Sequence, residues 1–243
     1  MTTLRSLAFN IWFFGLTAAC LLLSLPTHLM ARRWSCLVAK RWMDGLDWGL
    51  RVFCGLRFEV RGRVELLAQP GLIAAKHQSA WDTMIFHKIS PDPAYVMKKE
   101  ILSIPLYGWL AWKQGNIAVD RKGGAAALKK MVEAAERALA RGQQIVIFPQ
   151  GTRVPPGAPT TEWPYHPGVA GLYGKLGVGC VPVALNSGVF WGRRSFAKKP
   201  GTMVIEVLDP IPPGLSRAAF MRELESRIEA ASARLEAEAR AAG

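Results

Sequence analysis

Two residues capable of acid–base chemistry, His77 and Asp82, stand five positions apart in the segment Lys-His-Gln-Ser-Ala-Trp-Asp, directly after an apolar run at 72–75. If the chain turns into a helix there, the carboxylate can reach back to one ring nitrogen of the histidine. It would fix the tautomer and stabilise the imidazolium, leaving the other nitrogen to take a proton. We interpret the pair as a general base with its orienting carboxylate, suited to deprotonating an alcohol. Considered alone, the same spacing also fits an ordinary surface or capping pair.

Two arginines stand just past further β-rich runs. Arg121 ends the segment Gly-Asn-Ile-Ala-Val-Asp-Arg, and Arg153 ends Phe-Pro-Gln-Gly-Thr-Arg, where a tight turn would expose backbone N–H groups. Guanidinium groups pair with phosphate in bidentate geometry, so arginines at two strand ends predict a phosphate clamp. The alternative for each arginine is a surface salt bridge. A fourth segment, Val-Pro-Val-Ala-Leu at 181–185, has the composition of a buried strand interrupted by proline.

With these four segments in this order, the sequence resembles the 1-acyl-sn-glycerol-3-phosphate acyltransferase family, glycerolipid acyltransferases with four ordered motifs. The segment from His77 to Asp82 is similar to the H-x-x-x-x-D motif, and the segment ending at Arg121 to G-x-I-x-x-x-R. The segment ending at Arg153 is similar to F-P-E-G-T-R, and the strand through Pro182 to the fourth motif. The matching motifs cover roughly residues 70–190.

The resemblance implies direct acyl transfer to a lipid. His77, oriented by Asp82, would act as general base on the free sn-2 hydroxyl of lysophosphatidate. The oxygen would attack the thioester of an acyl carrier protein or of coenzyme A, without a covalent acyl-enzyme, and give phosphatidate for phospholipid synthesis. The acyl thioester is a co-substrate, and the resemblance implies no metal and no other cofactor.

The resemblance also implies which residues bind the substrate phosphate. They are Arg121, Arg153, and the Gly151-Thr152 turn of the third motif. Similar enzymes use a lysine after the strand that follows the first motif, and Lys98 is the best match. The neighbouring lysine at 99 is a second candidate for that role, and a solvated basic face is the alternative for both.

The third motif departs from the family at Gln150, where the family usually has glutamate. Glutamine keeps the length and the hydrogen-bonding capacity but removes the charge and the basicity. If the family's glutamate positions the glycerol moiety or the loop, Gln150 can replace it as a substrate-binding residue. His77 is then the proton acceptor of the site.

Other functions fit parts of the sequence. The same chemistry could act on another lysophospholipid or on lyso-ornithine lipid. A membrane-anchored hydrolase would need a nucleophile, but there is no G-x-S-x-G, Ser187 lacks the first glycine, and Ser79 is the one serine close to His77. A non-catalytic basic membrane adaptor would leave the four ordered motifs unexplained. Nucleic-acid binding has little support, since no basic stripe with interleaved aromatics is present.

The elements that must position these residues begin at about residue 56. Seven β-rich runs, at 58–60, 72–75, 94–97, 116–119, 145–148, 180–185 and 203–208, alternate with helical stretches at 125–140, 167–176 and 216–240. This alternation predicts one α/β domain, residues 55–243, with a mixed, largely parallel sheet flanked by helices. The prolines and glycines at 153–168 predict a long irregular loop, and loops of that length are usually functional.

Residues 1–54 are expected to anchor the chain in a membrane. No charged side chain lies between Arg5 and Arg32, and the interval holds about twenty largely apolar residues, enough for a helix to cross a bilayer. Basic residues and tryptophans follow, and the pattern at 33–54 predicts a second helix lying at the interface. This order of charges places the α/β domain on the cytoplasmic face of a bacterial inner membrane. The sequence leaves open whether the first helix spans the bilayer or re-enters it.

The composition agrees with an anionic partner. The chain has 31 basic and 18 acidic residues and a formal net charge of +13, which suits a bilayer surface or phosphate-bearing substrates. The four cysteines show neither C-x-x-C pairs nor nearby histidines at metal spacing, so a structural zinc site is not expected. A reducing compartment is the simplest interpretation of this cysteine pattern.

Overall fold

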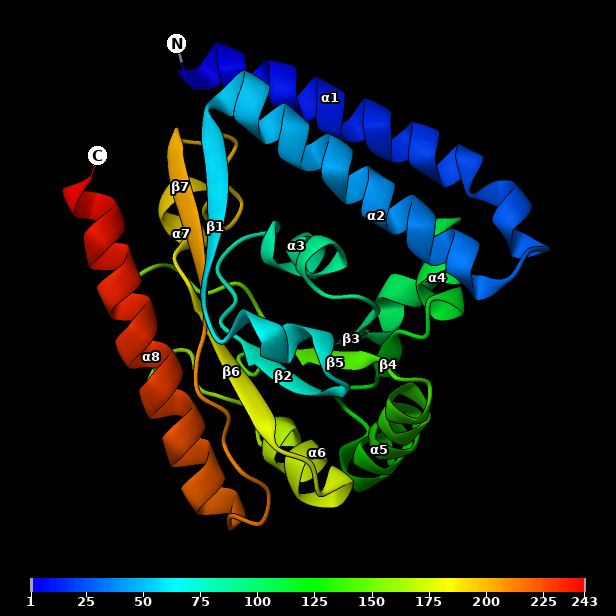
Figure 1. The fold of residues 1–243 in the computed structure, drawn as a ribbon, viewed down its shortest axis with the longest axis vertical. Coiled ribbons are helices and arrows are strands. Elements are labelled where there is room, and N and C mark those ends of the chain that lie inside the picture. Colours follow the sequence, from blue (N-terminus) through cyan, green and yellow to red (C-terminus); the bar gives the residue numbers. More distant parts are fainter. Residues whose placement is uncertain (1, 243) are drawn as a thin grey trace.

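A mixed seven-stranded sheet forms the centre of the protein (Figure 1). The computed structural model describes residues 2–242 of the chain. The strand order is β1-β7-β6-β2-β5-β3-β4. Strands β2 to β6 run parallel to one another, whereas β7 pairs antiparallel with β6 and parallel with β1. The strands are β1 (Leu56–Gly62), β2 (Gly71–Ala75), β3 (Pro93–Lys98), β4 (Ile117–Val119), β5 (Gln144–Ile147), β6 (Cys180–Leu185) and β7 (Gly201–Val207). All seven predicted strands and the largely parallel sheet are confirmed.

Helices cover both faces of the sheet because strand side chains alternate between them. Ile73 and Ala75 of β2 pack into a core with α1 (Thr2–Leu23), α2 (Arg32–Gly49) and α3 (Asp82–Ile89). Leu72 and Ala74 point to the opposite core, formed with α5 (Gly124–Ala140), α6 (Gly168–Leu176) and α8 (Arg217–Ala241). Two shorter helices, α4 (Tyr107–Lys113) and α7 (Ser187–Phe190), lie between strands. The three predicted helical stretches of the domain are confirmed as α5, α6 and α8.

The first two helices form a tight hairpin across one face of the domain (Figure 1). Gly45 and Gly49 of α2 admit α1 closely, since a Cβ on them would lie 2.7 Å from Leu16 Cδ2 and 2.4 Å from Trp12 Cδ1. The Trp12 indole also donates to the Gly45 carbonyl at 2.9 Å. Among residues 2–242, α1 is the one helix long and apolar enough to cross a membrane. The hairpin also contributes to the domain core, because Met43 belongs to the same cluster as the strand residues.

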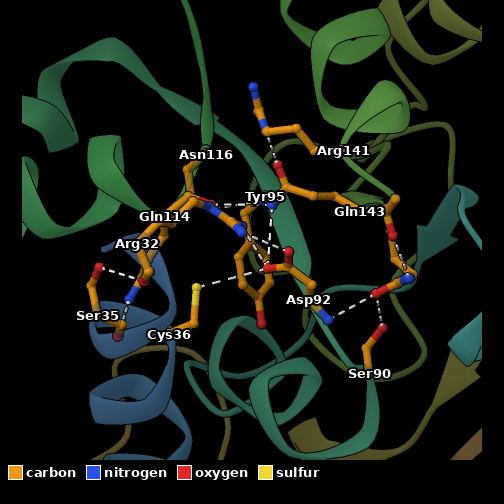
Figure 2. A network of polar contacts seen from close by, with 12 residues as sticks. Arg32, Ser35, Cys36, Ser90, Asp92, Tyr95, Gln114, Asn116, Arg141 and Gln143 are labelled. Atoms are coloured by element: carbon orange, nitrogen blue, oxygen red, sulfur yellow. Dashed lines mark hydrogen bonds and ion pairs between the residues drawn. The ribbon is translucent and has the colours of Figure 1, made fainter. Parts of the chain in front are cut away.

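The turn of the hairpin is tied to the edge of the sheet where β3, β4 and β5 begin (Figure 2). Arg32, the first residue of α2, donates two hydrogen bonds to the carboxylate of Asp92, at 2.8 and 2.6 Å. It also donates to the Gln114 carbonyl at 3.1 and 2.7 Å. Lys113 of α4 donates to the carbonyls of His28 and Met30 at 2.9 and 2.6 Å.

The other end of the hairpin is tied to the loop between α7 and β7. Lys198 is almost completely buried, and its ammonium donates to Asn10 Oδ1 of α1 at 2.5 Å. The Lys198 backbone N–H donates to the Ser6 hydroxyl at 3.0 Å, and the ring centroid of Trp191 lies 4.9 Å from the ammonium. The first half of α1 and the turn that follows it are therefore both held by the domain, so α1 lies along the domain.

Candidate active site

The predicted catalytic pair lies where β2 ends and α3 begins. His77 follows the last residue of β2 by two positions, and Asp82 is the first residue of α3. The helix turns the carboxylate back, so that His77 Nδ1 and Asp82 Oδ2 are 3.0 Å apart. The geometry that the spacing predicts is present, at the carboxyl end of a parallel strand, where ligands of α/β sheets bind.

The Asp82 carboxylate is completely buried and held by four partners. Oδ2 accepts from the backbone N–H groups of Gln78 at 2.6 Å and Ser79 at 2.8 Å, in addition to facing His77. Oδ1 accepts from the Ser187 hydroxyl at 2.6 Å. These contacts fix the carboxylate in place. It therefore keeps the imidazole proton on Nδ1 and leaves Nε2 as the basic nitrogen.

The serines considered as nucleophiles are used for other contacts. Ser187 donates to Asp82, and the Ser79 hydroxyl accepts from the Trp81 backbone N–H at 3.3 Å. Within residues 2–242, no serine hydroxyl is hydrogen-bonded to His77. A nucleophile activated by this histidine would need such a bond. The geometry thus favours a base that acts on a substrate group.

The third motif packs directly on the histidine because β5 lies beside β2 in the sheet. The ring of Phe148 stacks on His77, with centroids 4.4 Å apart and planes inclined by 28°. The Val154 N–H donates to the His77 carbonyl at 2.8 Å. The His77 side chain keeps 12% of its surface exposed. None of the described residues hydrogen-bonds its Nε2, which is therefore available to a substrate.

The second and third motifs meet at Gly151. This glycine has a φ of +62°, and a Cβ there would lie 3.3 Å from Arg121 Cζ and 3.1 Å from His166 Cδ2. Glycine thus permits both the turn and the close approach of the guanidinium. Burial lowers the pKa of Arg121, which remains a cation. In the described part of the chain, neither Arg121 nor Arg153 forms a salt bridge, so the surface-pair alternative does not account for them.

The two candidate lysines differ in their partners. Lys99 Nζ lies 2.6 Å from Asp120 Oδ2, next to Arg121 in sequence. Lys98, the last residue of β3, is exposed, and its side chain has no hydrogen-bond or ion-pair partner within residues 2–242. The Lys98 ammonium is thus unpaired at the edge of the sheet where the strands before the arginines also end, whereas the Lys99 ammonium is paired with Asp120.

Gln150 is directed into the protein and is only 3% exposed. Its Nε2 donates to the Trp163 carbonyl at 3.2 Å, and its Oε1 is buried without a described partner. The side chain therefore fastens the loop that follows the third motif, and that loop has no helix or strand before α6, as predicted. Thr152, half-exposed, continues the turn after Gly151.

A cavity of about 520 Å³ opens beside this cluster. Phe148, whose ring stacks on His77, forms part of its wall, so the base and the cavity are separated by one side chain. Its charged and polar lining residues are Asp120, Arg121, His166 and Arg217. The remaining wall is mostly apolar and includes Val96, Met97, Val119, Leu128, Met131 and Ile147. Sequence reasoning missed His166 and Arg217, although each stands within two residues of the start of a helix.

Comparison with known proteins assigns the chain to a family. A family model described as Acyltransferase matches residues 57–186. A 1-acyl-sn-glycerol-3-phosphate acyltransferase of Pseudomonas aeruginosa is 32% identical over 193 residues, which are 79% of this chain and 74% of the relative. The lyso-ornithine lipid O-acyltransferase of the same organism is 31% identical over 202 residues, 76% of each chain. The chain belongs to the acyltransferase family.

The fold agrees with a solved structure. The crystal structure of the 1-acyl-sn-glycerophosphate acyltransferase of Thermotoga maritima superposes with a TM-score of 0.75 and covers 98% of both chains. Its sequence is 18% identical to this one, so the likeness concerns the fold. Because the overlap reaches nearly the whole chain, it includes the hairpin as well as the sheet.

Proposed function

We propose that the protein is a 1-acylglycerol-3-phosphate O-acyltransferase, which moves a fatty acyl group from a thioester to the sn-2 hydroxyl of lysophosphatidate. The observation that carries this proposal is the His77–Asp82 pair, whose Nε2 has no partner among the described residues and whose ring stacks on Phe148, a wall residue of the cavity that Arg121 also lines. The relatives named for this reaction support the choice of substrate.

The geometry supports a direct transfer. His77 Nε2 takes the proton of the substrate hydroxyl while the oxygen attacks the thioester carbonyl, and the Asp82 carboxylate stabilises the imidazolium. As the tetrahedral adduct collapses, the carbon–sulfur bond breaks and the thiolate leaves with the proton that the imidazolium returns. An acyl carrier protein and coenzyme A both present such a thioester, and the net positive charge of the chain suits either anionic donor.

The phosphate of the acceptor would bind between Arg121, Arg153 and the Gly151-Thr152 turn, with Lys98 as a further cation. Guanidinium groups without protein partners are ready to pair with phosphate oxygens. The apolar cavity behind Phe148 suits an acyl chain, because its wall offers mainly aliphatic side chains. Gln150 would serve the site by holding the loop that encloses it.

Lyso-ornithine lipid is a second candidate acceptor. The lyso-ornithine lipid O-acyltransferase matches this chain with similar identity and similar coverage to the first relative. Detergent-solubilised protein would be tested with acyl carrier protein and coenzyme A donors against lysophosphatidate, lyso-ornithine lipid and neutral lysolipids. His77→Ala is the blank. Transfer to lyso-ornithine lipid without transfer to lysophosphatidate would reject our leading assignment.

We also propose how the enzyme sits on the membrane. The hairpin exposes large apolar side chains on its outer face, among them Leu4, Ile11, Phe14, Leu23 and Leu29. Since the first half of α1 and the turn after it are bound to the domain, the hairpin would enter one leaflet and leave the domain on the cytoplasmic face of the inner membrane. In spheroplasts, tags on the N-terminus and the C-terminus should both resist added protease. Digestion of the N-terminal tag alone would indicate a spanning helix.

A further inference from the structure

The two residues that flank the catalytic histidine are held by the C-terminal helix, α8. Lys76 precedes His77 and reaches Glu229, whereas Gln78 follows it and reaches Glu236. The two glutamates are seven positions apart, two turns of the helix, so they lie on the same side of α8. Neither glutamate falls within residues 57–186, the part of the chain that matches the family model.

The Lys76 contact is a nearly buried ion pair. The lysine side chain is 3% exposed, and its ammonium lies 2.6 and 2.7 Å from the two carboxylate oxygens of Glu229. A buried ammonium is costly unless it is paired, so removing the carboxylate would force the lysine to move towards water. Such a movement would displace the backbone next to His77.

Gln78 connects the C-terminal helix α8 to α7 and to Asp82. Its Nε2 donates to Glu236 Oε1 at 2.6 Å, and its Oε1 accepts from the Gly188 N–H at 3.1 Å. The backbone N–H of the same residue donates to Asp82 at 2.6 Å. Gln78 is completely buried, so its side chain has no water to replace these partners. The carboxylate of Glu236 thereby fixes the residue that, in turn, fixes Asp82.

Glu229 also contacts the loop after the third motif. The Tyr165 hydroxyl donates to Glu229 Oε1 at 2.8 Å, and the next residue, His166, lies against Gly151 and the cavity. Burial raises the pKa of Tyr165, so the phenol keeps the proton that it donates. One carboxylate thus joins the histidine end of β2 to the side of the site where Arg121 lies.

We infer that Glu229 and Glu236 of α8 are positioning residues for acyl transfer. Through Lys76 and Gln78 they keep His77 and Asp82 in their relative positions. This inference rests on the proposed function only for the choice of substrates. Neither glutamate touches the reacting atoms. Their contribution is to keep the base aligned, and a displacement of about 1 Å at a reacting group lowers rates by about 100-fold.

The decisive comparison is between two substitutions of the same residue in the full-length, detergent-solubilised enzyme. Glu236→Gln keeps an oxygen that accepts from Gln78, whereas Glu236→Leu has a similar volume and no acceptor. We expect kcat of Glu236→Leu to fall roughly 10-fold or more with KM changed less than about 2-fold, and Glu236→Gln to recover most of kcat. Glu229→Gln should also lower kcat, because Lys76 loses its counter-charge.

Glu223→Gln is the matched control, since it removes a carboxylate from the same helix and breaks a surface pair with Arg227 at 2.5 Å. It should leave kcat and KM unchanged. Circular dichroism and the unfolding midpoint establish that each variant is folded. An unchanged kcat in folded Glu236→Leu, or equal losses in the Leu and Gln variants, would overturn the inference.

A second measurement keeps the inference independent of the substrate. The downfield proton resonance of the His77 Nδ1–H, bonded to Asp82, should shift or broaden in Glu236→Leu and persist in Glu236→Gln. If wild-type protein transferred no acyl group to any acceptor, the proposed function would fail while this resonance still decided the positioning role. An identical resonance in wild type and Glu236→Leu would show that α8 does not align the pair.

Discussion

The two edges of the sheet use the same residue types for opposite purposes. At the edge where β3, β4 and β5 begin, Arg32 is bidentate on Asp92, and glutamine side chains complete the network (Figure 2). At the edge where β2 to β5 end, Arg121 and Arg153 have no carboxylate partner among the described residues, and His77 Nε2 is free. An arginine whose donors are satisfied stabilises the fold, whereas one that is left unsatisfied near a cavity is available to a ligand.

The largest expected effect is at the edge where β2 to β5 end, the open edge. His77→Ala removes the proton acceptor, so kcat should fall by about 10²–10⁴-fold, the contribution of general base catalysis. The unfolding midpoint should change little, because the imidazole makes one side-chain hydrogen bond, to Asp82. The measurement is steady-state transfer with the preferred donor and acceptor. Retention of wild-type kcat would show that His77 is not the proton acceptor.

The next effect should appear in substrate affinity. Arg121→Ala and Arg153→Ala each remove a charged donor to the phosphate, worth about 1.5–3 kcal/mol, so KM for lysophosphatidate should rise roughly 10- to 100-fold. A neutral lysolipid should be affected much less by the same variants. Arg222→Ala, which removes an exposed arginine of α8, is the control for net charge. Equal losses with charged and neutral acceptors would argue against a phosphate clamp.

At the closed edge, where β3, β4 and β5 begin, replacing an arginine should lower the stability of the fold and leave the rate of acyl transfer unchanged. Arg32→Met removes the pair with Asp92, whose side chains are 30% and 27% exposed, so the loss is screened and should be about 1–2 kcal/mol. For a chain of this size that corresponds to a fall of roughly 2–8 °C in the unfolding midpoint. The kcat should stay within about 2-fold of wild type. A large loss of kcat with an unchanged midpoint would contradict the division between the edges.

Much of this contrast was visible in the sequence, since the strands and the four motifs are local patterns. Runs of apolar residues in parallel strands mark β2 and β5, and the residues that follow them are those that meet at the open edge. Pairs such as Lys76 with Glu229 could not be predicted, because 153 positions separate them and no periodicity links them. Likewise, hydropathy indicates that α1 is apolar, but the contact of Lys198 with Asn10 arises only when the chain is folded.

The smallest effect is expected at Gln150, between the motif and its loop. Gln150→Glu restores the residue usual in the family, but an ionised carboxylate cannot donate to the Trp163 carbonyl. Burial favours the neutral acid and so raises the pKa of the introduced carboxyl. Below that pKa the protonated acid can donate, and above it the bond is lost and a charge is buried. The variant should therefore match wild type at acid pH and lose activity by a few-fold as the pH rises. The measurement is the ratio of variant to wild-type kcat/KM across pH, with Gln150→Met as a variant that lacks the donor at every pH. A ratio that is constant with pH would show that the Trp163 contact does not govern activity.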